Sequence, residues 1–358
     1  MWVAKMRIRN AIANKTTLLR CFLYLATAAC FLSCPRLIAD IDLAQQNKDI
    51  QGGVALGLFA SEPNYNYQSL LEEIRLHHGQ RLLVVIPFYL DTVFDHEMRL
   101  EPGLSPSVHN VERTLGQAKR FGFEITVMPI VRIKQRDKGD WRGRIAPRLG
   151  HQAFFEKYEA AILPIVRLSQ QFGVTRFVVG SELVSLEHER ALWAELIKSV
   201  RVIFKGRLSY AANWDHFRGP DFWDLVDEIG VSSYFELKLD ESEGQRIQQA
   251  TKQWRLFLTE LDAFAKVFEK PLFLMEVGYP AQITAARWPW DDTRHDKIDL
   301  DLQADLYRAF CNALHTNSEN IRGFFFWNWF GFGGPTDDSY TPRGKPAALV
   351  MKQCLLQF

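Results

Sequence analysis

Apolar runs rich in β-branched and aromatic residues recur along the chain, and each is followed by a segment with helical periodicity. Several runs are apolar on both faces, which is typical of strands that are covered by helices. The eight expected strands are 53–60, 81–90, 124–133, 174–183, 207–215, 227–237, 271–280 and 321–330. The pattern therefore predicts repeated βα units from residue 53 to the end of the chain.

The segments between these runs place apolar residues on one helical face. Ser107 is a favoured N-cap residue, and Gly122 is a favoured stop after the same helix. The expected helices are 68–77, 107–122, 154–172, 191–204, 247–268, 302–314 and 345–356, with only a short one, 220–226, after the fifth strand.

Eight alternating units predict an α/β fold of the (β/α)8 TIM barrel type. A doubly wound open sheet is the alternative, but neither G-x-G-x-x-G nor a P-loop motif follows any expected strand. No Ser/Gly linker marks a second domain. Residues 40–358 are therefore expected to form a single barrel domain, whose chemistry should lie at the C-terminal ends of its strands.

Composition supports a globular protein and excludes several other classes. The 358 residues are 47% apolar and 24% charged, with a net charge of +1, which argues against a disordered chain and against a nucleic-acid-binding protein. The charge is uneven, because no acid precedes Asp40. Residues from Asp40 onward carry 37 basic and 42 acidic side chains.

The first 39 residues are expected to be an export signal. Basic residues precede a 14-residue apolar run from Cys21 to Cys34, which is too short for a comfortable membrane span. The run ends Phe31-Leu-Ser-Cys34, which resembles a lipoprotein cleavage box that would leave a lipid-anchored Cys34. Cleavage after Ala39 and an uncleaved N-terminal anchor are the alternatives. The expected location is the periplasm or the outer cell surface, with membrane attachment through the N-terminus alone.

Only two cysteines, Cys311 and Cys354, lie beyond the signal. Two are too few for a disulfide framework. Each lies on an apolar helical pattern, which favours two buried thiols and leaves open whether they pair.

Two expected strands end in a carboxylate. Glu182 lies toward the end of the fourth and Glu276 toward the end of the seventh, each two residues from a glycine. A carboxylate at the end of a buried strand is costly unless it is paired or functional. A structural ion pair or a helix cap is the simpler interpretation of either one alone, but two across one barrel mouth favour glycoside hydrolysis.

Other strand ends and the loops after them supply aromatic and amide side chains of the kind that bind sugars. Aromatic residues are often plain core, so their gathering on one face of the barrel is the informative observation. The candidate substrate-binding residues are Trp141, Ser181, Asn213, Trp214, Tyr234, Trp288, Trp290 and Trp327.

Neither a metal nor a cofactor is expected. The pair His77-His78 lies on a solvated helix end, and H-E-x-x-H does not occur. The basic stretch Arg132–Arg148 is interpreted as a solvated loop, in preference to a patch for an acidic polysaccharide.

Five segments together resemble glycoside hydrolase family 113. They are Gly180-Ser-Glu182, Leu208–Asp215, Asp227–Phe235, Met275–Tyr279, and Trp327 with Gly344–Ala347. This resemblance covers roughly residues 53–351 and implies a retaining (β/α)8 glycosidase whose characterised relatives are β-1,4-mannanases.

The resemblance also implies roles for individual residues. Glu182 matches the general acid/base and Glu276 the nucleophile, while Trp141, Asn213, Trp214, Tyr234 and Trp327 match positions that line the sugar site. One departure is visible, since Ser181 stands where the wider clan has an Asn that touches the sugar 2-hydroxyl. Asn213 is the candidate replacement.

The expected function is therefore a retaining endo-β-1,4-mannanase with a polysaccharide or oligosaccharide substrate. Hydrolysis of another β-glycan or of an acidic exopolysaccharide is one alternative. A non-catalytic glycan-binding lipoprotein is the alternative from another class, although such a protein commonly loses one of the two acids.

Overall fold

The computed structural model describes residues 50–240, 245–315 and 318–358. The expected signal, residues 1–39, lies outside the described residues and stays a prediction. Within the described part, no helix is both long and apolar enough to cross a membrane.

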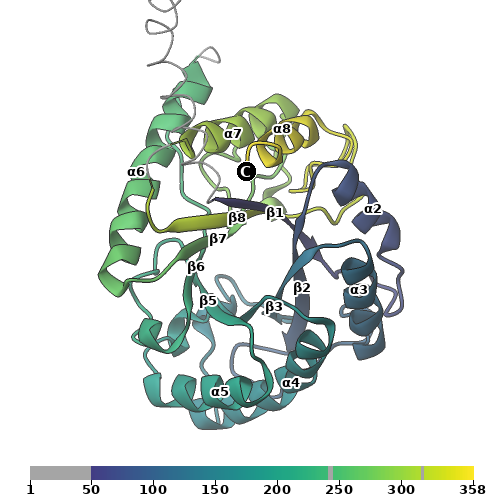
Figure 1. Ribbon diagram of the computed structural model, residues 1–358, viewed down its shortest axis with the longest axis vertical. Helices are drawn as coiled ribbons and strands as arrows, with labels where there is room; N and C mark the ends of the chain where they lie inside the picture. The colour runs from purple at the N-terminus through teal and green to yellow at the C-terminus, as the bar shows by residue number, and fades with distance from the viewer. Residues whose placement is uncertain (1–49, 241–244, 316–317) are drawn as a thin grey trace, which may run out of the picture. The chain divides into compact units, whose positions relative to one another are not determined.

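Eight parallel strands close into a barrel in simple sequence order, with β1 pairing to β8. Figure 1 looks into the ring of strands, with the helices arranged around its outside. The strands are β1 (Gln51–Gly57), β2 (Arg81–Leu90), β3 (Glu124–Ile133), β4 (Arg176–Ser181), β5 (Arg207–Asn213), β6 (Glu228–Ser232), β7 (Leu272–Val277) and β8 (Ile321–Phe326). The (β/α)8 prediction is confirmed.

The helices between these strands also follow the expected order. Ser107 caps α3 as predicted, because its side chain accepts a hydrogen bond from the backbone N–H of Asn110. Only a 3-10 turn, Trp223–Leu225, lies between β5 and β6. The α-helices are α2 (Gln68–Leu76), α3 (Val108–Arg120), α4 (His151–Phe172), α5 (Arg190–Ile203), α6 (Arg246–Phe268), α7 (Leu300–Ala313) and α8 (Pro346–Leu355).

Two apolar layers hold the barrel together. The larger layer lies between strands and helices, and the smaller one is a separate buried cluster that includes Val85, Met128, Val178 and Met275. The interior of such a barrel is a packed core and not a pore. Functional side chains are therefore confined to the ends of the strands.

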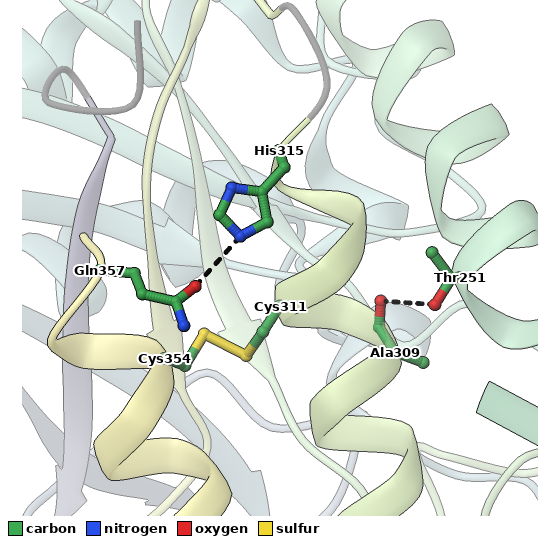
Figure 2. Close-up of a disulfide and its surroundings, with 6 residues drawn as sticks. All are labelled: Thr251, Ala309, Cys311, His315, Cys354 and Gln357. Carbon is green, nitrogen blue, oxygen red and sulfur yellow. Dashed lines mark hydrogen bonds between the residues drawn. A yellow bond between two sulfur atoms is a disulfide. The ribbon is translucent and has the colours of Figure 1, made fainter. Parts of the chain in front are cut away.

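A disulfide joins Cys311 in α7 to Cys354 in α8, so the interpretation of these residues as two buried thiols is wrong. The two Cα atoms are 5.8 Å apart, within the usual range for a disulfide. Figure 2 shows the bond between the two helices, with His315 and Gln357 hydrogen-bonded beside it. Helical periodicity indicates that each cysteine is buried, but pairing depends on how α7 packs against α8.

Candidate active site

A cavity of ≈ 1510 Å³ opens at the C-terminal ends of the strands. This volume exceeds the about 300–1,000 Å³ that is typical of sites for one drug-sized ligand, which indicates an extended ligand. Both candidate catalytic acids contribute to its lining. The predicted residues that line it are Trp141, Glu182, Asn213, Trp214, Tyr234, Glu276, Trp290 and Trp327. Eight of the ten sequence candidates are thus brought together.

Ser181 and Trp288 are not among the residues that line this cavity. Ser181 is buried, and its Oγ has no hydrogen-bond partner within the described part of the chain. The Trp288 ring instead packs against two guanidinium groups, those of Arg287 at 4.6 Å and Arg294 at 3.8 Å from its ring centre. The loop position of Trp288 indicated exposure, but the sequence does not show toward which side its ring points.

Glu276 is the penultimate residue of β7 and is buried, and two hydroxyl groups reach its carboxylate. Tyr234 donates to Oε2 at 2.7 Å, and Ser232 donates to Oε1 at 3.3 Å. Burial, followed by the charge of Glu182, raises the pKa of Glu276 to about 7, although Arg142 and the two hydroxyl groups oppose this shift. Glu276 therefore exchanges a proton near neutral pH, while its hydrogen bonds favour the ionised form that a nucleophile requires.

Glu182 follows β4 in a left-handed backbone conformation, with a φ of 54°. This conformation is costly for a residue other than glycine and needs support from its surroundings. The Glu182 N–H donates to the carbonyl of Ala211 at 2.8 Å, and the next N–H, that of Leu183, donates to the Tyr210 hydroxyl at 2.9 Å. That hydroxyl in turn donates to Glu187 at 2.8 Å. The network anchors the turn that carries Glu182 to β5.

Arg142 is a site residue that the sequence interpretation missed. It lies directly after Trp141 in the loop from β3 to α4, and its Nη2 is 2.7 Å from Oε2 of Glu182. Burial lowers the pKa of Arg142, but the charges of Glu182 and Glu276 outweigh burial and hold that pKa above its ordinary value. The interpretation of residues 132–148 as a solvated loop is therefore wrong at this position. The one sequence signal that could have indicated Arg142 is its position next to Trp141, a predicted substrate-binding residue.

We expect Arg142→Gln to move the acidic limb of the pH profile of kcat/KM to higher pH, by about 1 pH unit. The reason is that the Arg142 charge lowers the pKa of Glu276. Without it, Glu276 holds its proton to a higher pH and the ionised nucleophile is lost earlier on acidification. Arg142→Lys keeps the charge and is the matched control. An acidic limb that stays at the wild-type pH in Arg142→Gln would contradict this electrostatic role.

Aromatic rings line opposite parts of the cavity. Trp214, after β5, stacks on Trp290 from the loop after β7, with ring centres 5.5 Å apart and planes inclined by 22°. Trp327, after β8, packs against Phe59 at 6.1 Å. Trp290 is 42% exposed, so its outer face is open to a ligand at the rim of the cavity. Flat exposed rings of this kind suit the apolar faces of sugar rings.

We expect Trp290→Ala to raise KM for a polymer by roughly 2–10-fold with little change in kcat. The substitution removes the exposed outer ring of the Trp214 stack. Trp288→Ala is the control, because its ring packs against Arg287 and Arg294 and does not line the cavity. Steady-state kinetics on polymer and on a short oligosaccharide check both variants. Equal effects of the two substitutions would exclude the rim as a binding surface.

The charges around the cavity are mixed but predominantly acidic. Eight acidic and four basic side chains line it. The acidic ones are Asp140, Glu182, Asp215, Glu276, Asp291, Asp292, Asp337 and Asp338, and the basic ones are Arg132, Lys134, Arg136 and Arg142. A lining with an excess of carboxylates disfavours a polyanionic ligand.

A closed (β/α)8 barrel that holds two carboxylates at the mouth of one aromatic-lined cavity has the features of an O-glycosyl hydrolase. Residues 57–340 match the model of Glycoside Hydrolase Family 113, and the chain belongs to this family. The resemblance inferred from the sequence is thereby confirmed, and the protein is a glycoside hydrolase.

Solved structures with the same fold include three mannanases. The GH113 β-mannanase AaManA from Alicyclobacillus acidocaldarius, in complex with ManMIm, is 24% identical with a TM-score of 0.75, over 85% of this chain and 96% of that one. A GH113 β-1,4-mannanase is 22% identical with a TM-score of 0.73, and the match covers 86% of this chain and 98% of that chain. The endo-β-1,4-mannanase from Thermotoga petrophila is 13% identical with a TM-score of 0.54, over 86% and 77%. No curated protein sequence matches the chain.

Proposed function

We propose that this enzyme is a retaining endo-β-1,4-mannanase in which Glu276 is the nucleophile and Glu182 the general acid/base. The observation that carries the proposal is the pair of hydroxyl donors on Glu276, from Tyr234 and Ser232, in the cavity that Glu182 also lines. These donors stabilise an ionised carboxylate, which is the form that attacks the anomeric carbon. Glu182 then protonates the departing oxygen and later takes a proton from water.

Mannan as the substrate follows from the family and from the names of its solved members. Two of the structures with this fold are described as GH113 β-mannanases, and one of them as a β-1,4-mannanase. The size of the cavity and the open face of Trp290 support a polymer chain that extends beyond the two acids, and thus endo action. The excess of acidic side chains in the lining favours this neutral glycan over an acidic exopolysaccharide.

The experiment that tests the substrate is reducing-sugar release from mannan, glucomannan, xylan, β-glucan and an acidic polysaccharide. We expect mannan to be cleaved fastest, with manno-oligosaccharides of mixed length among the first products. Faster cleavage of another β-glycan would keep the mechanism and reject mannan. No cleavage of any polymer, together with binding of one, would favour the non-catalytic glycan-binding lipoprotein.

We also propose export to the periplasm or the outer surface, with a lipid-anchored Cys34. The supporting observations are the basic start and apolar run of the sequence, together with the disulfide between Cys311 and Cys354, since disulfides persist in oxidising compartments. Mass spectrometry of the mature N-terminus tests this. Acylated Cys34 supports the anchor, a start at Asp40 supports soluble release, and an intact Met1 on a cytosolic protein rejects export.

A further inference from the structure

Three potential metal ligands meet where α4 and α5 begin, apart from the cavity. His151 is the first residue of α4, while His188 and Glu189 immediately precede α5. One ligand atom from each lies within 4.8 Å of the other two. None of these residues lines the cavity, and the proposed hydrolysis does not use them.

Both imidazoles approach the same carboxylate oxygen. His151 Nδ1 lies 2.6 Å from Oε1 of Glu189, and His188 Nε2 lies 3.2 Å from the same atom. The two rings stand edge to face with their centres 5.8 Å apart. Within the described part of the chain, Glu189 is the polar partner of both rings. The two imidazole nitrogens and this carboxylate oxygen therefore lie close enough together to surround one ion.

These separations fit a tetrahedral ion after small side-chain adjustments. Zinc binds imidazole nitrogen and carboxylate oxygen at about 2.0–2.2 Å, which places neighbouring ligand atoms about 3.4 Å apart in a tetrahedron. Two nitrogens and one oxygen suit Zn²⁺ better than Mg²⁺ or Ca²⁺, which prefer oxygen ligands alone. The His188 side chain is 67% exposed, so an ion can enter from solvent and keep water as a fourth ligand.

We propose that His151, His188 and Glu189 form a binding site for one Zn²⁺ ion. The ion would connect the loop from β3 to α4 with the loop from β4 to α5. The first loop carries Arg142 and the second carries Glu182, so the site braces the two segments whose side chains meet at 2.7 Å in the active site. Because Zn²⁺ sits outside the cavity, its role is structural and it takes no part in hydrolysis.

Zinc content is the direct test. The full chain is dialysed against Zn²⁺ at mildly alkaline pH, because protons compete with a metal ion for its ligands, and bound zinc per chain is measured. We expect the wild type to hold one ion more than His188→Ala and one more than Glu189→Gln. His109→Ala is the matched control, because His109 also faces a single carboxylate, Glu112, at 3.6 Å on an exposed helix face. Any zinc bound by Cys21, Cys30 or Cys34 is common to all variants and cancels.

A second measurement tests the bracing. Zn²⁺ should raise the Tm of the wild type and slow amide hydrogen exchange in residues 143–151 and 183–190, and EDTA should reverse both effects. His188→Ala should show neither response, and its circular dichroism should match that of the wild type because His188 is exposed. Equal zinc content in the wild type and His188→Ala overturns the proposal and leaves an ion-pair network only. Zinc content, Tm and hydrogen exchange are measured without substrate, so their outcome does not depend on the proposed mannanase activity and the two proposals fail separately.

Discussion

Glu276→Ala should reduce polymer turnover below detection while the barrel stays folded. The substitution removes the group that attacks the anomeric carbon, so no glycosyl-enzyme forms. Folding should survive because the alanine also removes a buried carboxyl group whose ionisation burial and Glu182 oppose. Added azide should enter the space and attack the anomeric carbon directly. One displacement inverts the configuration, so the product is an α-glycosyl azide from a β-linked substrate.

The control is Glu236→Ala, which removes a carboxylate from the loop after β6 that does not line the cavity. Its turnover should resemble that of the wild type. Product configuration is measured by NMR on an activated aryl glycoside. A β-glycosyl azide from Glu276→Ala would exchange the roles assigned to the two acids, and near wild-type cleavage of polymer would remove Glu276 from the mechanism.

The acidic limb of the wild-type pH profile reflects the pair of catalytic acids to which Glu276 belongs. With a pKa of about 7, Glu276 in the free enzyme is half protonated near neutral pH and gains its charge as pH rises. The limb in kcat/KM belongs to the coupled pair of acids and not to one residue alone. The nucleophile assignment therefore predicts activity that increases from mildly acidic toward neutral pH.

The barrel could be predicted from the sequence because buried strands and half-buried helices place apolar residues at regular spacings. Strands covered on both sides read as continuous apolar runs, and seven of the eight helices of the expected set appear as α-helices. The expected strands nevertheless extended too far at their C-terminal ends. β5 ends at Asn213, β6 at Ser232 and β8 at Phe326, two to five residues before the expected ends. Trp214, Tyr234 and Trp327 therefore lie on loops. The expected strands were too long because these aromatic residues continue the apolar pattern of the strands before them.

The sequence predicts a site residue where its position on a strand determines the direction in which its side chain points. It does not predict a site residue whose role depends on contacts between distant loops. Glu182 and Glu276 follow from the ends of β4 and β7. The contact of Arg142 with Glu182 requires the fold of the loop from β3 to α4, and no periodic pattern encodes it. The disulfide is a similar case, since Cys311 and Cys354 are 43 residues apart in sequence. The local sequence pattern indicates which residues are buried. The ion pair of Arg142 with Glu182 and the disulfide depend instead on how whole loops and helices pack together.

Glu182→Ala should behave differently from Glu276→Ala, because the nucleophile remains. Polymer cleavage should fall by about 10²–10⁴-fold, since the departing sugar oxygen no longer receives a proton. An aryl glycoside with an acidic phenol as leaving group needs no such proton, so its glycosyl-enzyme still forms and then accumulates without a general base. Azide attacks that intermediate in a second displacement and should give the β-glycosyl azide, with retained configuration.

This second outcome also separates a role in catalysis from the contact with Arg142. Glu182→Ala leaves the guanidinium of Arg142 without its partner at 2.7 Å, which by itself would disturb the site. A merely structural loss would lower turnover of polymer and of the activated aryl glycoside alike, and azide would restore neither. A loss on polymer that azide does not reverse, together with aryl glycoside turnover that azide restores with retention, is what general acid/base catalysis by Glu182 requires. An aryl glycoside reaction that azide does not restore would contradict the assignment.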